Sequence, residues 1–418
     1  MRILFVVPNV PSPIRPRPFN FIRRLSRIHD VSVLCLATND SDHKFVSELK
    51  KYCTNVEVVE VSRIKSAWNC LLALFSSRPL RYAFFDSSTL ERRVREKVER
   101  KEVDILHVEH LKAALILRDV NWQVPSILDA VDCVSLFEER RRKLLHNPLL
   151  KAFFWSEWKK MAWWESKISG RFDRLVISSP VDKQQYPGAP DVQERLEVVA
   201  NGVDLEYFQF QRYEPRKNVL VFCAKLDYFP NADAALYFSS MIWPLLLARR
   251  PELQFEIVGS RPPRAIRELD GKNNIRVTGS VPDVRPHLGS ASIAVCPVRI
   301  QAGTQFKILE AMALGVPVIA SRLCCPGLAV EPGKHLLTAD APGEYVSAVE
   351  SLLDDDGLRR TLVQAGRQYV ATHHDWTLSV HRLLQAYERA LAKHGITMRP
   401  SAPQTANSAV VNSGAAGF

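Results

Sequence analysis

Short apolar runs alternate with amphipathic segments from one end of the chain to the other. Runs that are apolar on both faces and alternate with segments of helical period indicate parallel strands covered by helices. Because this pattern occurs twice, we expect an α/β protein with two doubly wound, Rossmann-like domains. The predicted strands of the first half are Ile3–Val7, Val31–Leu36, Val56–Val61, Ile105–Val108, Ser126–Leu128, Leu175–Ile177 and Leu196–Val199. Those of the second half are Val219–Cys223, Phe255–Val258, Ile275–Thr278, Ile293–Cys296, Val316–Ala320 and Leu336–Thr338. Predicted helices include Phe19–Ile28, Ala232–Leu247 and Phe306–Leu314.

A polar and aromatic segment near residues 201–216 interrupts the pattern between the two halves. We interpret it as the connection between two domains, which we place at residues 1–200 and 201–375. Ligands of such sheets bind at the carboxyl ends of the strands, so we expect the two domains to face each other across a cleft. Residues 376–398 predict a helix that packs back towards the first domain. Residues 399–418 are small, polar and proline-containing, which predicts a disordered tail.

The formal net charge of +11 suits a phosphorylated ligand, an anionic membrane surface or nucleic acid. The basic residues are diffuse and form no recognition module, so we expect no nucleic-acid partner. No stretch approaches the roughly 20 apolar residues of a spanning helix, and MRILFVVPNV fits a first strand better than a signal peptide. The eight cysteines form no C-x-x-C pair, so no zinc site or redox motif is indicated. We expect a cytoplasmic protein and leave open a peripheral contact with the inner face of the plasma membrane.

The segment QAGTQFKILEAMALGVPVIAS, residues 301–321, combines a glycine-containing loop, an amphipathic helix, a Gly-x-Pro turn and a buried strand. Gly303 lets the backbone approach a ligand, and Thr304 opens a helix whose free N–H groups and positive dipole end attract phosphate. Lys307 adds a positive charge in the first turn. One turn further along, Glu310 can accept hydrogen bonds from a ribose diol. The alternative is an ordinary βα unit with an exposed Lys–Glu pair.

The run KILEAMALGVPVIA in this segment resembles the signature of glycosyltransferase family 4, the group 1 glycosyltransferases, which are retaining enzymes of GT-B fold. The resemblance extends over most of the chain, through NGVDLEYF, LVFCAKLDYFPNADAALYF, VTGSVPDVRPHL, EPGKHLLTAD and HDWTLSVHRLLQAYERAL. The more particular resemblance is to sugar transferases of bacterial exopolysaccharide loci. It implies a donor-binding second domain and an acceptor-side first domain.

The resemblance implies roles for particular residues of the second domain. Glu310 would bind the ribose of the nucleotide, and the turn around Val281 would hold the base through backbone groups. Gly303, Thr304 and Lys307 would hold the diphosphate. The charge of Lys307 would also act in catalysis, because stabilising the developing phosphate charge is a large part of this chemistry.

The resemblance also implies partners. Lys225 falls near a position where many relatives carry an arginine that meets the phosphates. The expected partners are a nucleotide-sugar donor and a lipid-linked or saccharide acceptor. No metal or other cofactor is expected.

One departure from the family pattern concerns the residue eight positions before Glu310. The family carries glutamate there, and this chain has Ala302. The missing glutamate is expected to touch the donor sugar, so its loss bears on sugar choice and rate. A glycosyltransferase-like binding or scaffold protein without turnover is therefore a second hypothesis. A nicotinamide-dependent oxidoreductase is disfavoured because no G-x-G-x-x-G follows the first strand.

The loop after the first strand, within Pro8–Leu25, is rich in proline where relatives have glycine. Such a stiff loop cannot wrap a phosphate as a glycine nest does. Arg15 and Arg17 are retained, and both suit the diphosphate or an anionic acceptor. The alternative is an exposed basic loop without a ligand.

Acidic residues follow the predicted strand at Ser126–Leu128. Asp129 and Asp132 stand near its carboxyl end, where a carboxylate can orient the acceptor hydroxyl or take its proton. The alternative for Asp132 is a cap on the next helix.

Histidines follow another strand of the first domain. His107 and His110, with Glu109 between them, are expected to line the same cleft, although a lone histidine is more often structural.

The segment Lys151–Phe172 carries four tryptophans among lysines at helical spacing. One interpretation is a helix that packs into the core. The other is a membrane-surface contact, because tryptophan and lysine together suit lipid headgroups. The tryptophans are Trp155, Trp158, Trp163 and Trp164, and the basic run Arg140–Lys143 lies just upstream.

Overall fold

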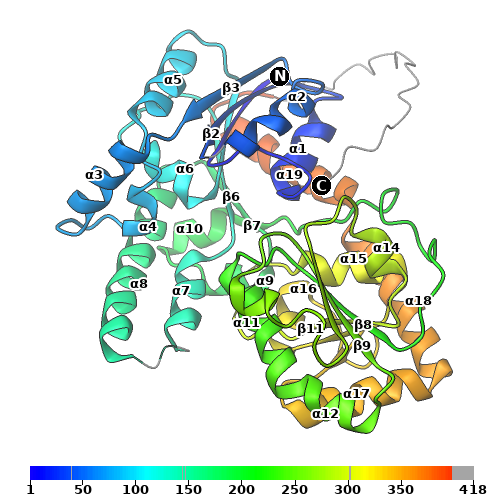
Figure 1. Ribbon diagram of the computed structural model, residues 1–418. Helices are drawn as coiled ribbons and strands as arrows, with labels where there is room; N and C mark the ends of the chain where they lie inside the picture. Colours follow the sequence, from blue (N-terminus) through cyan, green and yellow to red (C-terminus); the bar gives the residue numbers. More distant parts are fainter. Residues whose placement is uncertain (39, 144, 146, 301–302, 398–418) are drawn as a thin grey trace. The chain divides into compact units, whose positions relative to one another are not determined.

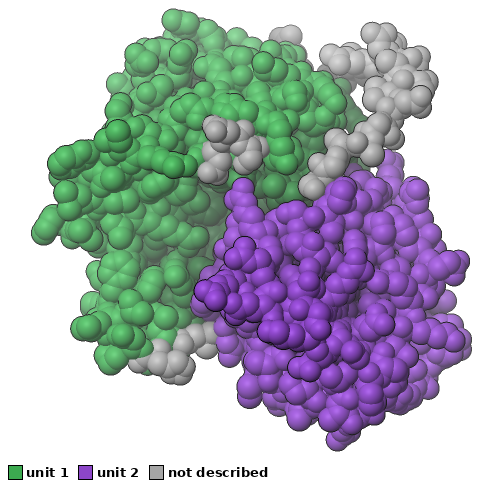
Figure 2. Space-filling model, viewed as in Figure 1, with its two compact units in different colours: residues 1–200, 376–407 green, residues 201–375, 408–418 purple. Residues whose placement is uncertain are grey.

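The computed structural model describes residues 1–38, 40–143, 145, 147–300 and 303–397. The contacts divide the described chain into two compact units, coloured separately in Figure 2. Unit 1 holds residues 1–200 and the C-terminal helix from Trp376 onward, and unit 2 holds residues 201–375.

Unit 1 is built on a parallel sheet of seven strands in the order β3-β2-β1-β4-β5-β6-β7. Its central strands are apolar on both faces because helices cover both sides, as Figure 1 shows for α1 and α19 on one face and α5 and α6 on the other. The strands are β1 (Arg2–Val7), β2 (Asp30–Ala37), β3 (Asn55–Glu60), β4 (Ile105–Glu109), β5 (Ser126–Val131), β6 (Arg174–Ile177) and β7 (Leu196–Val198). The helices are α1 (Pro16–Leu25), η1 (Asp40–Phe45), α2 (Val46–Leu49), α3 (Arg63–Ala73), α4 (Leu80–Ala83), α5 (Ser88–Glu99), α6 (His110–Ile116), α7 (Val134–Lys143), α8 (Pro148–Ser169), α9 (Pro180–Gln185), α10 (Pro190–Arg195) and α19 (Trp376–Lys393).

Unit 2 repeats the architecture with a parallel sheet of six strands in the order β10-β9-β8-β11-β12-β13. The strands are β8 (Val219–Cys223), β9 (Gln254–Val258), β10 (Ile275–Gly279), β11 (Ile293–Cys296), β12 (Val318–Ala320) and β13 (Leu337–Thr338). The helices are α11 (Phe229–Tyr237), η2 (Phe238–Ile242), α12 (Trp243–Arg249), α13 (Arg264–Arg267), α14 (Arg285–Gly289), α15 (Phe306–Leu314), η3 (Arg322–Cys324), α16 (Cys325–Leu328), α17 (Pro342–Asp354) and α18 (Asp356–His373).

The α/β fold class predicted from the hydrophobic pattern is confirmed, and each predicted strand overlaps an observed one. Two predicted helices differ in detail. The first begins earlier than expected, at Pro16, because the fixed φ of proline suits the first helical position. The helix predicted over Ala232–Leu247 contains a π-helical turn, η2, just before Pro244, a residue that cannot donate the regular helical bond.

Helix α19 packs against α1, β5 and β6 of unit 1. At its start Trp376 is buried and meets the ring of Phe21 edge-on, with ring centroids 5.5 Å apart. The tail predicted over residues 399–418 lies outside the described residues. None of the helices that the structure describes is long and apolar enough to span a bilayer.

Candidate functional site

The loop and first turn of α15 form the centre of the site in unit 2. Gly303 takes a left-handed conformation, with φ of 70°, immediately before the helix. Thr304 is 9% exposed, and its hydroxyl oxygen has no hydrogen-bond partner among the described residues. Because a buried hydroxyl without a partner costs free energy, it marks a place suited to a polar ligand. The helix ends at Gly315, whose φ of 83° supplies the left-handed cap.

Lys307 lies in the first turn of α15. Its ammonium donates to Gln305 Oε1 at 2.8 Å and to Asn231 Oδ1 at 3.1 Å. Both acceptors are neutral amides, and Lys307 forms no ion pair within the part of the chain that the structure describes. The positive charge of Lys307 therefore remains available for an anion, and it adds to the positive end of the helix dipole.

Asn231 connects this helix start to the segment that follows β8. Its side-chain amide donates to the backbone oxygen of Lys225 at 2.8 Å while its oxygen accepts from Lys307. Lys225 itself is about half exposed, and its ammonium lies 3.5 Å from Asp227 Oδ1. Arg261, after β9, lies 3.6 Å from the other oxygen of Asp227. Asp227 and Asn231 lie within LVFCAKLDYFPNADAALYF, the segment that resembles the family, but their roles and that of Arg261 could not be predicted because the contacts join separate segments of the chain.

Glu310 lies one turn beyond Lys307 on the same helix. Burial raises the pKa of this carboxyl to about 7, and the charge of Lys307 acts in the opposite direction. Among the described residues no donor forms a hydrogen bond with the Glu310 carboxylate. A partly buried acceptor without donors suits a ligand that brings two hydroxyl groups.

A glycine brings the ends of β8 and β9 together beside this helix. Gly259 has a φ of 155°, and a Cβ atom there would lie 1.7 Å from the backbone oxygen of Ala224. Only glycine allows this approach. Beyond the next strand, Val281 is partly buried and packs against the core of unit 2, in the turn that was expected to hold a base.

Arg17 and Asp129 form a buried ion pair in unit 1. Arg17 Nε lies 2.7 Å from Asp129 Oδ2, and Arg17 Nη1 donates to the backbone oxygen of Val199 at 2.9 Å. The other Asp129 oxygen accepts the N–H of Val131. Both side chains are almost fully buried, so Arg17 does not belong to an exposed basic loop.

His107 lies against the same pair. Its Nε2 is 3.8 Å from Asp129 Oδ2, and its Nδ1 forms a 2.9 Å hydrogen bond with the hydroxyl of Tyr387 in α19. Burial lowers the pKa of His107 to about 4, although Asp129 favours the charged form. The ring is therefore neutral at pH 7, as in a core histidine.

The carboxyl end of β4 carries two further titratable groups. Burial, followed by the charge of Asp129, raises the pKa of Glu109 to about 8, so this acid holds a proton at neutral pH. His110 begins α6 with a φ of 67°, and its Nδ1 accepts the N–H of Lys112 at 3.2 Å. Burial lowers the pKa of His110 well below its usual range.

A kink at the end of β5 separates Asp132 from Asp129. Val131 has a φ of 66°, which is strained for a β-branched residue, and the pairing with β6 shifts there. Asp132 is partly exposed and accepts a hydrogen bond from Ser178 at 3.2 Å. Burial, followed by the charge of Asp182, raises the pKa of Asp132 to about 7.

The interpretation of Asp132 as a helix cap is wrong. The first N–H groups of α7, from Val134 and Ser135, donate to the carboxylate of Glu165 at 2.6 and 3.0 Å. Glu165 belongs to α8 and was not identified from the sequence, because no local spacing connects it to α7.

Arg15 forms hydrogen bonds with other partners. Its guanidinium donates to the backbone oxygen of Val10 at 3.0 Å and lies 3.2 Å from Asp42 Oδ1. The structure thus brings Arg17, Asp129 and His107 together in unit 1. In unit 2 it places Gly303, Thr304, Lys307 and Glu310 on one helix start, with Lys225 connected through Asn231. Ala302 lies outside the described residues.

Helix α8 buries one of its tryptophans in the core, and others are half exposed. Trp164 and Met161 are buried in the core of unit 1. Trp155 and Trp163 are about half exposed, with Lys159 and Lys167 over their rings.

Comparison with known proteins relates unit 2 to one family. Residues 217–355 match the family model described as "Glycosyl transferases group 1". A D-inositol 3-phosphate glycosyltransferase of Rhodococcus jostii is 26% identical over 265 residues, covering 57% of this chain and 57% of the relative. A GDP-mannose-dependent monoacylated alpha-(1-6)-phosphatidylinositol monomannoside mannosyltransferase of Corynebacterium glutamicum is 32% identical over 240 residues. The match covers 52% of this chain and 62% of the relative. The chain thus spans less than two thirds of these relatives.

Solved structures share the fold over nearly the whole chain. Sucrose-phosphate synthase from Thermosynechococcus elongatus aligns with a TM-score of 0.69 at 13% identity, covering 94% of this chain and 100% of that one. Anabaena HepE in complex with UDP aligns with a TM-score of 0.63 at 15% identity, covering 92% and 99%. The GT-B fold expected from the sequence is confirmed by these likenesses.

Proposed function

The chain carries a group 1 glycosyl transferase domain over residues 217–355, and from this premise we propose that the protein is a retaining glycosyltransferase. Its substrate is a nucleotide-diphosphate-sugar, and the sugar passes to a hydroxyl group of an acceptor. In that reaction the bond between the anomeric carbon and the diphosphate breaks. The acceptor oxygen bonds to the same carbon, and the hydroxyl proton is released.

The single observation that carries this proposal is the start of α15. It presents the positive end of the helix dipole, the ammonium of Lys307, whose hydrogen bonds go to neutral amides, and a hydroxyl on Thr304 without a partner among the described residues. Together these groups suit the diphosphate, and Glu310, one turn along, suits the ribose diol. In this assignment Lys307 stabilises the negative charge that grows on the departing diphosphate. Lys225 and Arg261 add positive charge near the end of β8 and β9, and the proposal includes no metal or other cofactor.

On the acceptor side, Asp132 is the residue that contacts the acceptor hydroxyl in this proposal. Of the two aspartates near the carboxyl end of β5, Asp132 is the one that is partly exposed. With a pKa near 7 it can accept a proton at neutral pH. Asp129 is then a positioning residue, because Arg17 and the N–H of Val131 occupy its oxygens.

The names of related proteins support the substrate classes. The Corynebacterium relative is named as GDP-mannose-dependent and acts on a phosphatidylinositol mannoside, and Anabaena HepE was solved with UDP. For this chain the proposed acceptor is lipid-linked or a saccharide. The proposed setting is exopolysaccharide or other cell-surface glycan synthesis, at the cytoplasmic side of the membrane.

Calorimetry with a panel of UDP-, GDP- and other nucleotide-sugars tests the donor site. Wild type should bind one nucleotide class saturably, and Glu310→Gln should bind it at least about tenfold more weakly. Glu252→Gln, an exposed glutamate of unit 2, is the matched control and should bind like wild type. Absence of binding to every nucleotide-sugar, or equal binding by Glu310→Gln, would refute this site.

A further inference from the structure

Helix α3 of unit 1 turns its large apolar side chains to solvent. This helix projects from the body of the unit (Figure 1). Two more exposed apolar residues follow in the turn after it. The exposed fractions are 75% for Ile64, 62% for Trp68, 48% for Leu71, 66% for Leu72, 53% for Leu74 and 88% for Phe75. Monomeric proteins rarely leave so many large apolar side chains exposed together, so the cluster marks a docking surface.

The exposed residues follow the period of an α-helix. Ile64, Trp68, Leu71 or Leu72, and Phe75 are spaced by three or four positions and so share one face. In most proteins such a face packs on the core. Here the core side of α3 is small and polar instead. Its contacts are Ser66 Oγ with Phe84 O at 2.6 Å, Asn69 Nδ2 with Asp86 O at 3.4 Å, and Cys70 Sγ with Leu80 O at 3.8 Å.

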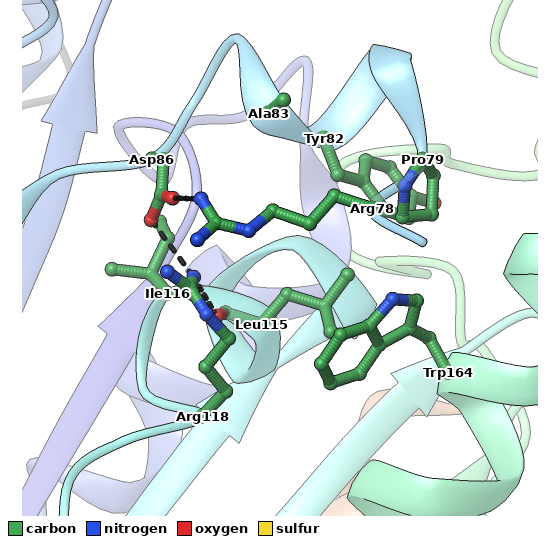
Figure 3. A pocket seen from close by; sticks show the side chains of 9 residues that line it. All are labelled: Arg78, Pro79, Tyr82, Ala83, Asp86, Leu115, Ile116, Arg118 and Trp164. Atoms are coloured by element: carbon green, nitrogen blue, oxygen red, sulfur yellow. Dashed lines mark hydrogen bonds and ion pairs between the residues drawn. The ribbon is translucent and has the colours of Figure 1, made fainter. Parts of the chain in front are cut away.

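The chain that follows α3 is fixed, so the outward orientation is built into the fold. Trp164 Nε1 donates to Ser77 O at 3.0 Å, and the N–H of Leu80 donates to Glu157 Oε2 at 2.8 Å. A pocket lies beside this segment, between α4, α6 and α8. In Figure 3, Arg78 and Arg118 both point to Asp86, each with a nitrogen 3.0 Å from a carboxylate oxygen. These contacts hold the base of α3 against unit 1.

The charge of the segment favours an anionic partner. Residues 61–85 contain no acidic side chain, but they include four basic ones. Arg63 and Lys65 are exposed beside the apolar face, and in the described chain neither forms an ion pair. A second copy of this surface would bring like charges together, which disfavours self-association through it.

We infer that α3, with Leu74 and Phe75, inserts shallowly into the interface of an anionic lipid bilayer. The apolar face enters between the headgroups and acyl chains, and Arg63 and Lys65 meet anionic headgroups. The exposed tryptophans and lysines of α8, beside the α4 segment, extend the same chemistry. This inference goes beyond sugar transfer and does not depend on it.

Vesicle co-sedimentation of the full chain tests the inference, with phosphatidylcholine vesicles compared to vesicles that also contain phosphatidylglycerol. Wild type should bind the anionic vesicles and lose most of this binding at high salt. The triple variant Trp68→Ser, Leu72→Ser and Phe75→Ser should bind at least about tenfold more weakly. Arg63→Glu with Lys65→Glu should weaken binding to anionic vesicles alone.

Leu245→Ser is the matched control, since Leu245 is 47% exposed on α12 of unit 2. It should bind vesicles like wild type, and all variants should keep the wild-type thermal unfolding midpoint. Sedimentation velocity tests whether a second copy of the chain, and not a bilayer, covers the exposed face of α3. Equal vesicle binding by wild type and the triple variant would overturn the inference, as would a dimer that the triple variant dissociates without any vesicle binding by wild type.

Discussion

Arg17 and Asp129, 112 positions apart in the chain, form an ion pair that is almost completely buried, with Nε 2.7 Å from Oδ2. The pair joins the start of α1 to the end of β5. With His107 and Tyr387 it forms a continuous group of contacts that also includes α19. It therefore fixes the carboxyl end of the sheet, from which the partly exposed Asp132 follows.

Breaking this pair should destabilise the protein strongly. Asp129→Ala leaves a buried guanidinium without its counter-charge, so we expect a loss of about 3–5 kcal/mol in the free energy of unfolding. The double variant Arg17→Met with Asp129→Leu should lose less than Asp129→Ala alone, because no charge then stays buried. Urea denaturation measures both. A loss by Asp129→Ala no larger than that of the exposed-pair variant Glu268→Ala would contradict the assignment.

Glu310 should make both stability and donor binding depend on pH. Its pKa is raised from 4.5 to about 7, so unfolding releases a proton between these values and stability falls as the pH rises through this window. Glu310→Gln has no carboxylate to ionise in the buried site, so it should be more stable than wild type at about pH 8, by at most about 3 kcal/mol. Denaturation at several pH values measures the difference.

The same titration bears on the nucleotide. The ionised carboxylate accepts stronger hydrogen bonds from a diol than the protonated acid does, so wild-type affinity should rise from about pH 6 to about pH 8. Glu310→Gln should show a flat profile. A wild-type profile as flat as that of the variant would remove Glu310 from the ribose site.

Asp132 and Ser178 should shape the pH dependence of transfer. If Asp132 takes the acceptor proton, kcat/KM should rise as the pH rises through an apparent pKa near 7. Asp132→Asn should abolish this limb of the pH profile. The hydrogen bond from Ser178 lowers the pKa of Asp132, so Ser178→Ala should move the limb to higher pH. Initial rates over a pH series measure this shift. A limb that persists in Asp132→Asn belongs to another group.

Gly259→Ala should damage unit 2 because the new Cβ atom would lie 1.7 Å from Ala224 O. We expect a loss of about 2 kcal/mol or more in the free energy of unfolding, together with weakened donor binding. Gly271→Ala is the control, since Gly271 also has a positive φ but nothing lies within 4 Å of its Cβ position. That variant should lose only about 1 kcal/mol. An equal loss of unfolding free energy in both variants would show that the close approach of Gly259 to Ala224 O is not required.

The sheets could be predicted from the sequence because buried parallel strands appear as short apolar runs, as at β8 and β11. The start of α15 could also be predicted, since Gly303, Lys307 and Glu310 lie within one turn or two of each other. Contacts across long separations could not. Nothing local connects His107 to Tyr387, 280 positions away, or the N–H groups of α7 to Glu165. Nor does the helical period of Ile64 and Trp68 reveal that this face points outward, because the same period is typical of a core-facing helix.

Acceptor-dependent turnover tests the central claim most directly. The nucleotide-sugar that binds most tightly is incubated with candidate lipid-linked and saccharide acceptors, and release of the nucleoside diphosphate is followed together with the anomeric configuration of the product by NMR. We predict release that requires an acceptor, a product with the donor's configuration, and a rate at least about a hundredfold lower in Lys307→Met. Saturable donor binding with no release in the presence of any acceptor would contradict the account and indicate a binding or scaffold protein without turnover.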